Sequence, residues 1–143
     1  MKEYRMRLMP VALAALIGFS YVSVPTSAKA TEADPLVASI CDYVKANDKN
    51  RLRKKLKESR VKLRQVYSGI SCDGQSLLRT AYAVNANDAG EFVAKRLSAN
   101  ELSVPEADGM TIQAWAEANG HSASPITAAV KERLGAGAGG EEE

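Results

Sequence analysis

The chain repeats one short pattern of apolar residues, and this repetition limits the folds that it can adopt. Ala46-Asn47-Asp48 and Ala86-Asn87-Asp88 each follow a stretch in which apolar or small residues recur three and four apart. A fainter third copy relates Asp73-Gly74-Gln75-Ser76-Leu77 to Asp108-Gly109-Met110-Thr111-Ile112. Each copy predicts a helix, a tight turn and a second helix. One such hairpin cannot cover its own apolar face, so neighbouring copies must cover it.

The fold class that follows is all-α: a compact array of about three stacked helical hairpins. The expected first helices carry Val37, Ile40, Cys41 and Val44, then Leu77, Leu78, Ala81 and Val84, then Ile112, Trp115 and Ala116. The expected second helices carry Leu52 and Leu56, then Phe92, Val93 and Leu97, then Ile126, Ala129 and Val130.

Local signals predict where two of the second helices begin. Asp88 with Glu91 three residues later has the pattern of a capping box, and Ser124 before Pro125 has the pattern of an N-cap. Residues 60–71 are ambiguous: their apolar residues alternate as in a strand and fit a short helix equally well.

Residues 1–30 have the pattern of a secretory signal peptide. Three basic residues precede an apolar run from Leu8 to Val22, and Ala28-Lys29-Ala30 offers the small residues that a signal peptidase recognises. A membrane anchor is the alternative, but the run is shorter than the roughly 20 apolar residues that span a bilayer. We therefore expect cleavage near Ala30, a periplasmic or secreted mature chain, and no transmembrane anchor in it.

The mature chain is expected to form one domain followed by a tail. Residues 31–134 are long enough for a single helical domain with a modest core. Residues 135–143, which read GAGAGGEEE, have little to bury, and we expect them to be disordered.

Both cysteines, Cys41 and Cys72, lie in the expected mature chain. In an oxidising compartment an even number of cysteines predicts a disulfide, here one bond from the first hairpin to the start of the second. A redox-active pair is the alternative, but the Cys-x-x-Cys spacing that lowers a thiol pKa is missing.

The stretch from Gly74 to Ala81 is similar to the start of an ankyrin repeat. It departs from that pattern at Leu77, in the proline position, and at Arg79, in the histidine position. The likeness therefore extends to the hairpin arrangement and not to a proper ankyrin repeat.

A closer resemblance covers residues 36–97. Ile40-Cys41 after an apolar lead-in, and Cys72-Asp73-Gly74-Gln75 before Ser76-Leu77-Leu78, resemble the family of exported bacterial proteins called domain of unknown function 3718. Asp73 replaces the asparagine of that family's Asn-Gly-Gln signature, and both residues tolerate a left-handed turn before glycine. The resemblance implies export, a helical domain and no assigned activity.

Residue types that carry catalysis are scarce. The single histidine, His121, follows Gly120 in an expected turn, where a surface position is the ordinary explanation and a catalytic or metal-binding role is the alternative. The chain has no Gly-x-Ser-x-Gly elbow and no glycine-rich phosphate loop before a helix. Trp115 is expected in the core of the third hairpin, with stacking on a ligand as the alternative. We therefore expect no enzymatic activity, no cofactor and no metal.

Positive charge is concentrated in one segment. Residues 45–64 contain ten basic and two acidic side chains, a net charge of +8. The rest of the expected mature chain contains five basic and 14 acidic residues, a net charge of −9. A solvated helix face balanced by acidic neighbours would explain the segment, and an anionic partner is the functional alternative.

We expect the protein to act by binding through this basic helix. The candidate contact residues are Arg51, Arg53, Lys54, Lys57, Arg60, Lys62 and Arg64. The expected partner is an anionic envelope component or an acidic protein. Nucleic acid is not expected, because the chain is exported and no aromatic residues are interleaved for base stacking. The second hypothesis is a self-associating structural or stress-related envelope protein, since its opposite charges would join copies head to tail.

Overall fold

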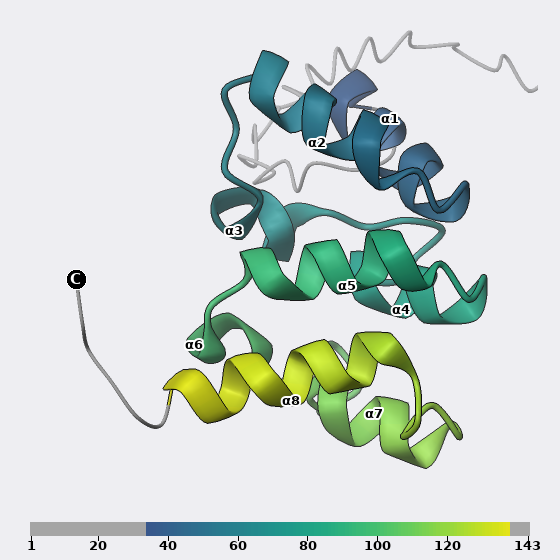
Figure 1. Cartoon of the computed structure of the whole chain (residues 1–143), viewed down its shortest axis with the longest axis vertical. Helices are drawn as coiled ribbons and strands as arrows, with labels where there is room; N and C mark the ends of the chain where they lie inside the picture. The colour runs from purple at the N-terminus through teal and green to yellow at the C-terminus, as the bar shows by residue number, and fades with distance from the viewer. Residues whose placement is uncertain (1–33, 138–143) are drawn as a thin grey trace, which may run out of the picture.

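The computed structural model describes residues 34–137, which form three stacked helical hairpins (Figure 1). The hairpins pair α1 (Pro35–Lys45) with α2 (Lys49–Glu58), α4 (Leu77–Ala83) with α5 (Asn87–Arg96), and α7 (Ile112–Ala118) with α8 (Pro125–Gly137). Shorter helices occupy the connections: α3 (Leu63–Val66), the 3-10 helix η1 (Tyr67–Gly69) and α6 (Ala99–Leu102). The predicted fold class is confirmed. The predicted signal peptide with its cleavage site, and residues 138–143 of the predicted tail, lie outside the described residues.

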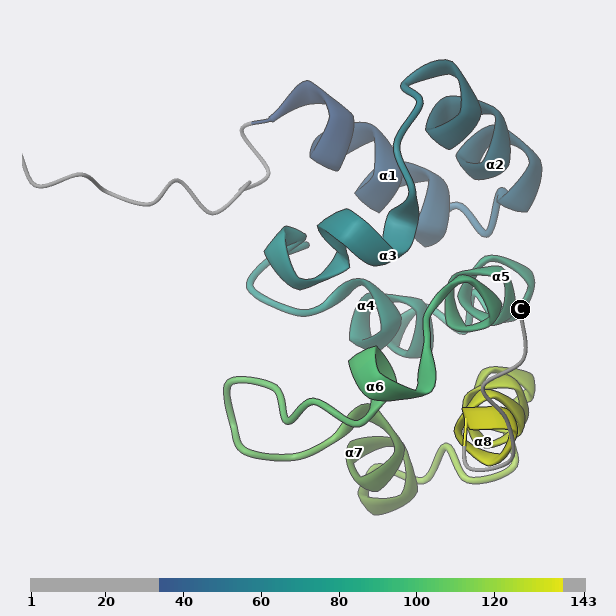
Figure 2. The same cartoon turned by 90° about the vertical axis from the view of Figure 1, so that its left-hand side faces the viewer.

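The hairpins stack so that equivalent helices form two columns (Figure 2). Helices α1, α4 and α7 make one column and α2, α5 and α8 make the other, while α3 and α6 lie on the side that faces the viewer. Helix α4 packs against α1 and α7, and α5 packs against α2 and α8. Each hairpin therefore buries the apolar face that it cannot cover alone. The core includes Val37, Ile40, Leu52, Leu77, Leu78, Val93, Ile126 and Val130.

The turns show that the two Ala-Asn-Asp phrases are not structurally equivalent. The residues with left-handed φ between paired helices are Asn47 (54°), Asn85 (53°) and Gly120 (80°). Asparagine and glycine suit this place because they tolerate positive φ after a helix. Asn47 therefore corresponds to Asn85, and the sequence match that paired it with Asn87 is wrong by two residues.

The correspondence between Asn47 and Asn85 explains why Val84 is exposed. Val84, which the periodicity places in the core, is 46% exposed. Tyr82 takes the buried position that Val44 occupies in the first hairpin, and both are almost fully buried.

Helix α5 begins without the capping box that the sequence predicts. Its N-cap is Ala86, which has no capping side chain, and Asp88 lies in the first turn of the helix. The backbone N–H of Ala89 donates instead to Oδ1 of Asn47 in the first hairpin (2.9 Å). The Asp88–Glu91 prediction is wrong because the cap comes from a residue distant in the chain.

Helix α8 starts as predicted and ends later than predicted. Ser124 Oγ accepts from the N–H of Ile126 (3.2 Å), which confirms the N-cap. The expected tail begins at residue 135, yet residues 135–137 continue the helix. Gly137 lies so close to Ala99 of α6 that a Cβ on it would overlap the alanine methyl. The absence of a side chain thus lets the last turn of α8 pack against α6.

The disulfide between Cys41 and Cys72 is present, as predicted, and joins α1 to the chain before α4. Cys72 and Gln75 exchange backbone hydrogen bonds across a tight turn. Its central residues, Asp73 and Gly74, have φ of 51° and 80°. An Asp-Gly pair suits this turn because both central residues need positive φ. Residues 60–71 adopt the helical alternative, as α3 and η1.

The close contact between α5 and α8 depends on a glycine in α5. A Cβ on Gly90 would overlap the side chain of buried Ile126. We expect Gly90→Val to lower the free energy of unfolding by about 1–3 kcal/mol, because overpacking displaces the neighbouring helix. Urea denaturation measures this change in the free energy of unfolding. Gly135→Val is the matched control, since among the described residues, apart from its chain neighbours and the nearby backbone of its own helix, nothing lies within 4 Å of the point that its Cβ would occupy. Equal urea midpoints for the two variants would contradict the close packing.

The disulfide closes a sequence separation of 31 residues. We expect the double variant Cys41→Ala, Cys72→Ala to lose roughly 3 kcal/mol of unfolding free energy, because the bond restricts the unfolded chain. Calorimetry of the variant and of the reduced protein measures the loss. An unchanged melting temperature in both would show that the bond adds no stability.

Candidate functional site

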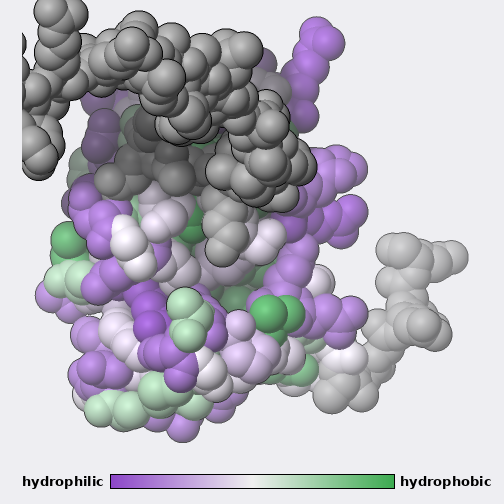
Figure 3. Space-filling view, turned by 180° about the vertical axis from the view of Figure 1, so that it is seen from behind, coloured by the Kyte–Doolittle hydropathy of each residue, from purple (hydrophilic) through white to green (hydrophobic). Residues whose placement is uncertain are grey.

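A basic groove of about 690 Å³ lies between α2, α3 and the end of α5. Its positively charged lining residues are Arg53, Lys57, Arg60, Lys62, Arg64, Lys95 and Arg96. Its apolar lining residues are Leu56, Val61, Leu63 and Phe92. Among the residues that the structure describes, no carboxylate lines this groove. Figure 3, seen from behind, shows hydrophilic side chains projecting along the right-hand edge of the molecule, which is the left-hand side of Figure 1, where α3 and the ends of α2 and α5 lie.

Local structure explains why the five cations between residues 53 and 64 border the same groove. Helix α2 buries Leu52 and Leu56, which leaves the intervening Arg53 exposed. After α2, Arg60 has a left-handed φ of 53°, and the N–H of Val61 donates to the carbonyl of Leu56 (3.1 Å). This Schellman turn ends the helix and redirects the chain into α3, so the rest of the basic segment borders the same hollow as α2.

Helix α5 completes the groove from the second hairpin. Lys95 and Arg96 lie in its last turn, where positive charge favours the helix dipole. The Arg96 guanidinium lies 4.9 Å from the centre of the Phe92 ring. The groove therefore has cations above an aromatic and aliphatic floor.

Few acidic groups neutralise these cations. Within residues 34–137, Lys95 is the one groove cation with an ion pair, to Glu91 (2.6 Å). That hydrogen bond raises the pKa of Lys95. The remaining groove cations create a positive potential, because at moderate salt charges within about 10 Å of one another are only partly screened.

The structure divides the seven predicted contact residues into two groups. Five of them, Arg53, Lys57, Arg60, Lys62 and Arg64, line the groove. Arg51 pairs with Asp48 (3.2 Å) and Lys54 with Glu58 (3.8 Å) on their own helix, outside the groove.

Sequence reasoning missed the contribution of Phe92, Lys95 and Arg96. They belong to the next hairpin, and their local pattern is that of an ordinary amphipathic helix end. A basic pair one turn after an aromatic residue was the signal in the chain, but its meaning depends on which helix lies opposite.

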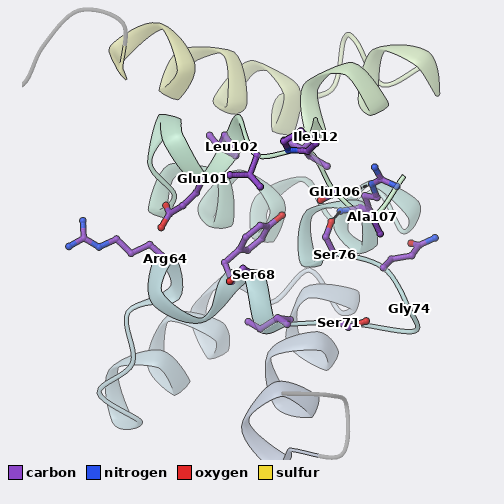
Figure 4. A pocket seen from close by; sticks show the side chains of 16 residues that line it. Arg64, Ser68, Ser71, Gly74, Ser76, Glu101, Leu102, Glu106, Ala107 and Ile112 are labelled. Atoms are coloured by element: carbon purple, nitrogen blue, oxygen red, sulfur yellow. Dashed lines mark hydrogen bonds and ion pairs between the residues drawn. The ribbon is translucent and has the colours of Figure 1, made fainter. Parts of the chain in front are cut away.

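A second hollow, a cavity of about 670 Å³, lies on the other side of α3 (Figure 4). It is bounded by η1, the start of α4 and the segment 103–111. Its lining combines apolar side chains, among them Leu102, Val104 and Ile112, with several serine hydroxyls. Arg64 lines this cavity as well as the basic groove.

Arg79 of α4 holds segment 103–111 as one wall of the cavity. Its two terminal nitrogens each lie 2.8 Å from an oxygen of Asp108, and it also pairs with Glu106. The guanidinium lies 4.9 Å from the centre of the Trp115 ring. Hydrogen bonds from Arg79 lower the pKa of Asp108 to about 2.

An aromatic cluster lies beside this anchor, because Trp115 contacts both Arg79 and His121. Trp115, which is expected in the core of the third hairpin, is half-buried and packs against the core. Its ring stacks with His121 at a centroid distance of 5.8 Å, and both rings contact Tyr82. The Tyr82 hydroxyl hydrogen-bonds Thr127 (2.8 Å), which links the second hairpin to α8.

Two further properties concern the part of the chain from residue 34 to residue 137. It contains no group of three or more His, Cys, Asp or Glu side chains placed to hold a metal ion. None of its helices combines the length and the apolar character needed to cross a bilayer.

The disulfide and the Asp-Gly turn lie within the stretch that a known family matches. The family described as "Protein of unknown function (DUF3718)" matches residues 40–104. Residues 40–104 are therefore similar to this family. The match confirms the resemblance and continues past residue 97, where the sequence likeness was expected to end. The matched stretch includes the whole basic groove, while α7 and α8 follow it. No curated protein and no solved structure matches the chain.

We expect Asp108→Asn to lower the melting temperature at pH 7, because it removes a carboxylate that binds Arg79. The pKa of Asp108 is about 2, below the ordinary value of 3.8. Its contribution is therefore complete above about pH 4 and is lost as the pH falls towards 2. The melting-temperature difference between Asp108→Asn and the original protein should shrink over this interval. Exposed Asp42→Asn is the control, and a difference that stays constant down to pH 2 would contradict the assignment.

Proposed function

We propose that the protein is a non-catalytic binding protein that holds an anionic partner in its basic groove. One observation carries the proposal: seven cations from two hairpins converge on a hollow that no carboxylate lines within residues 34–137. A solvated face of α2 would explain only the cations that α2 itself carries. The groove also recruits Lys95 and Arg96 from α5.

The groove suits phosphate or sulfate groups. Four of its seven cations are arginines: Arg53, Arg60, Arg64 and Arg96. Guanidinium groups bind such anions through paired, charge-assisted hydrogen bonds. A bound polyanion also relieves the repulsion between neighbouring cations.

We place this activity in the cell envelope, after export of the mature chain. The pattern of residues 1–30 supports export, and the disulfide supports an oxidising compartment. The partner is then an anionic envelope component. The packing of His121, the single histidine, against Trp115 and Tyr82 supports a structural role for this residue rather than a catalytic one.

Self-association is a second candidate, favoured by the segregation of charge along the chain. The segment 45–64 has a net charge of +8, and acidic residues predominate after it. Copies joined by these charges would dissociate as salt is added. Sedimentation at several ionic strengths tests this, and a monomer at every salt concentration would remove the candidate.

Retention on immobilised heparin tests the binding proposal. We expect the triple variant Arg60→Gln, Lys62→Gln, Arg64→Gln to bind more weakly. The slope of log affinity against log salt concentration should fall by up to roughly 3, because fewer counterions are released.

The matched control is Lys49→Gln, Arg51→Gln, Lys54→Gln, which removes the same charge from exposed positions of α2 outside the groove. It should bind nearly as well as the original protein. Equal weakening of both variants would show that net charge, and not the groove, determines retention.

A further inference from the structure

The groove and the cavity border one another across α3. Arg64, which lies within this short helix, lines both hollows. Leu63, just before it, lines the groove, and Tyr67, just after α3, lines the cavity. Figure 4 shows the Arg64 side chain at one end of the cavity, on the side of Glu101. A molecule that contacts Arg64 therefore has access to two hollows of different chemistry.

The cavity differs from the groove in what it can hold. Glu101 and Glu106 line it together with Arg64 and Arg79, so its charged groups balance, whereas the groove is lined by cations without a carboxylate among the described residues. Ile70, Leu102 and Ile112 supply apolar surface. Its volume of about 670 Å³ lies within the range of ~300–1,000 Å³ typical of small-molecule sites.

Val104 marks the open side of this cavity. It is 60% exposed, an unusual state for a large aliphatic side chain that lines a hollow. Its side chain adds apolar surface to the lining, and ligand pockets are lined mainly by apolar side chains.

The Tyr67 hydroxyl adds an unsatisfied polar group. It is buried and lacks a hydrogen-bond partner among the described residues. It lies near the Ser76 hydroxyl and the Leu78 backbone N–H, without reaching either in hydrogen-bond geometry. Burial raises the pKa of Tyr67, so the phenol keeps its proton. A buried hydroxyl of this kind is satisfied by an uncharged acceptor such as an ester oxygen.

We propose that the ligand is a single amphiphilic anion, with a phosphate group in the basic groove and an acylated, apolar part in the cavity. The inference rests on the proposed function and adds the chemical class of the ligand. The groove cations bind the phosphate, Arg64 lies at the junction, and the Tyr67 hydroxyl donates to an ester oxygen. Leu102, Val104 and Ile112 then cover the apolar chain.

Calorimetric titration with two soluble probes tests the proposal. The first is dihexanoyl phosphatidic acid, kept below its critical micelle concentration, and the second is glycerol 3-phosphate. We expect the acylated probe to bind at least about tenfold more tightly, because its chains bury apolar surface. Equal affinities for the two probes, with groove-dependent heparin retention intact, would overturn the amphiphile and leave the proposed function standing. Loss of groove dependence on heparin would instead overturn the proposed function.

Two variants locate the chain in the cavity. Ser68→Trp fills the cavity from an exposed lining position and should weaken the acylated probe about tenfold, without changing heparin retention. Ser122→Trp, at an exposed site outside both hollows, is the matched control and should change neither.

Tyr67→Phe removes one oxygen and keeps the ring, so it tests the hydroxyl even if the tryptophan variant fails to fold. It should weaken the acylated probe several-fold and leave heparin retention unchanged. Unaltered affinity of the acylated probe for Tyr67→Phe, together with Ser68→Trp that folds and binds normally, would place the chain elsewhere and overturn the proposal.

Discussion

The bond between Cys41 and Cys72 encloses the segment that carries most of the positive charge. Five of the seven groove cations lie between the two cysteines, and cations held this close repel one another. The bond keeps α2, its Schellman turn and α3 close to α1 and the start of α4. A groove that concentrates like charge therefore depends on covalent closure of the chain that supplies it.

The hairpins are also joined by specific polar contacts. Apolar burial pulls hairpins together without fixing their register, since it has little directional preference. Asn47 binds the start of α5, Arg79 binds the segment before α7, and Tyr82 binds Thr127 of α8. These contacts each link residues of successive hairpins. Of the three, the Asn47 contact joins the first hairpin to α5, and it therefore bears on how α2 and α5 lie on either side of the groove.

The connection between the first two hairpins has the largest role in the proposed binding. Its local sequence is ambiguous, yet it forms α3 and η1 and separates the groove from the cavity. Arg64, which belongs to the four-residue helix α3, lines both hollows.

The sequence by itself determined the three hairpins, the disulfide and the Asp73-Gly74 turn. These features depend on residues within a few positions of one another, or on a single possible pair of cysteines. Only the tertiary structure decided that Asn47 caps α5, that Asn85 rather than Asn87 is its counterpart, and that Phe92, Lys95 and Arg96 complete the groove. Helical periodicity shows which face of a helix is buried, whereas the neighbour it meets depends on how distant helices pack.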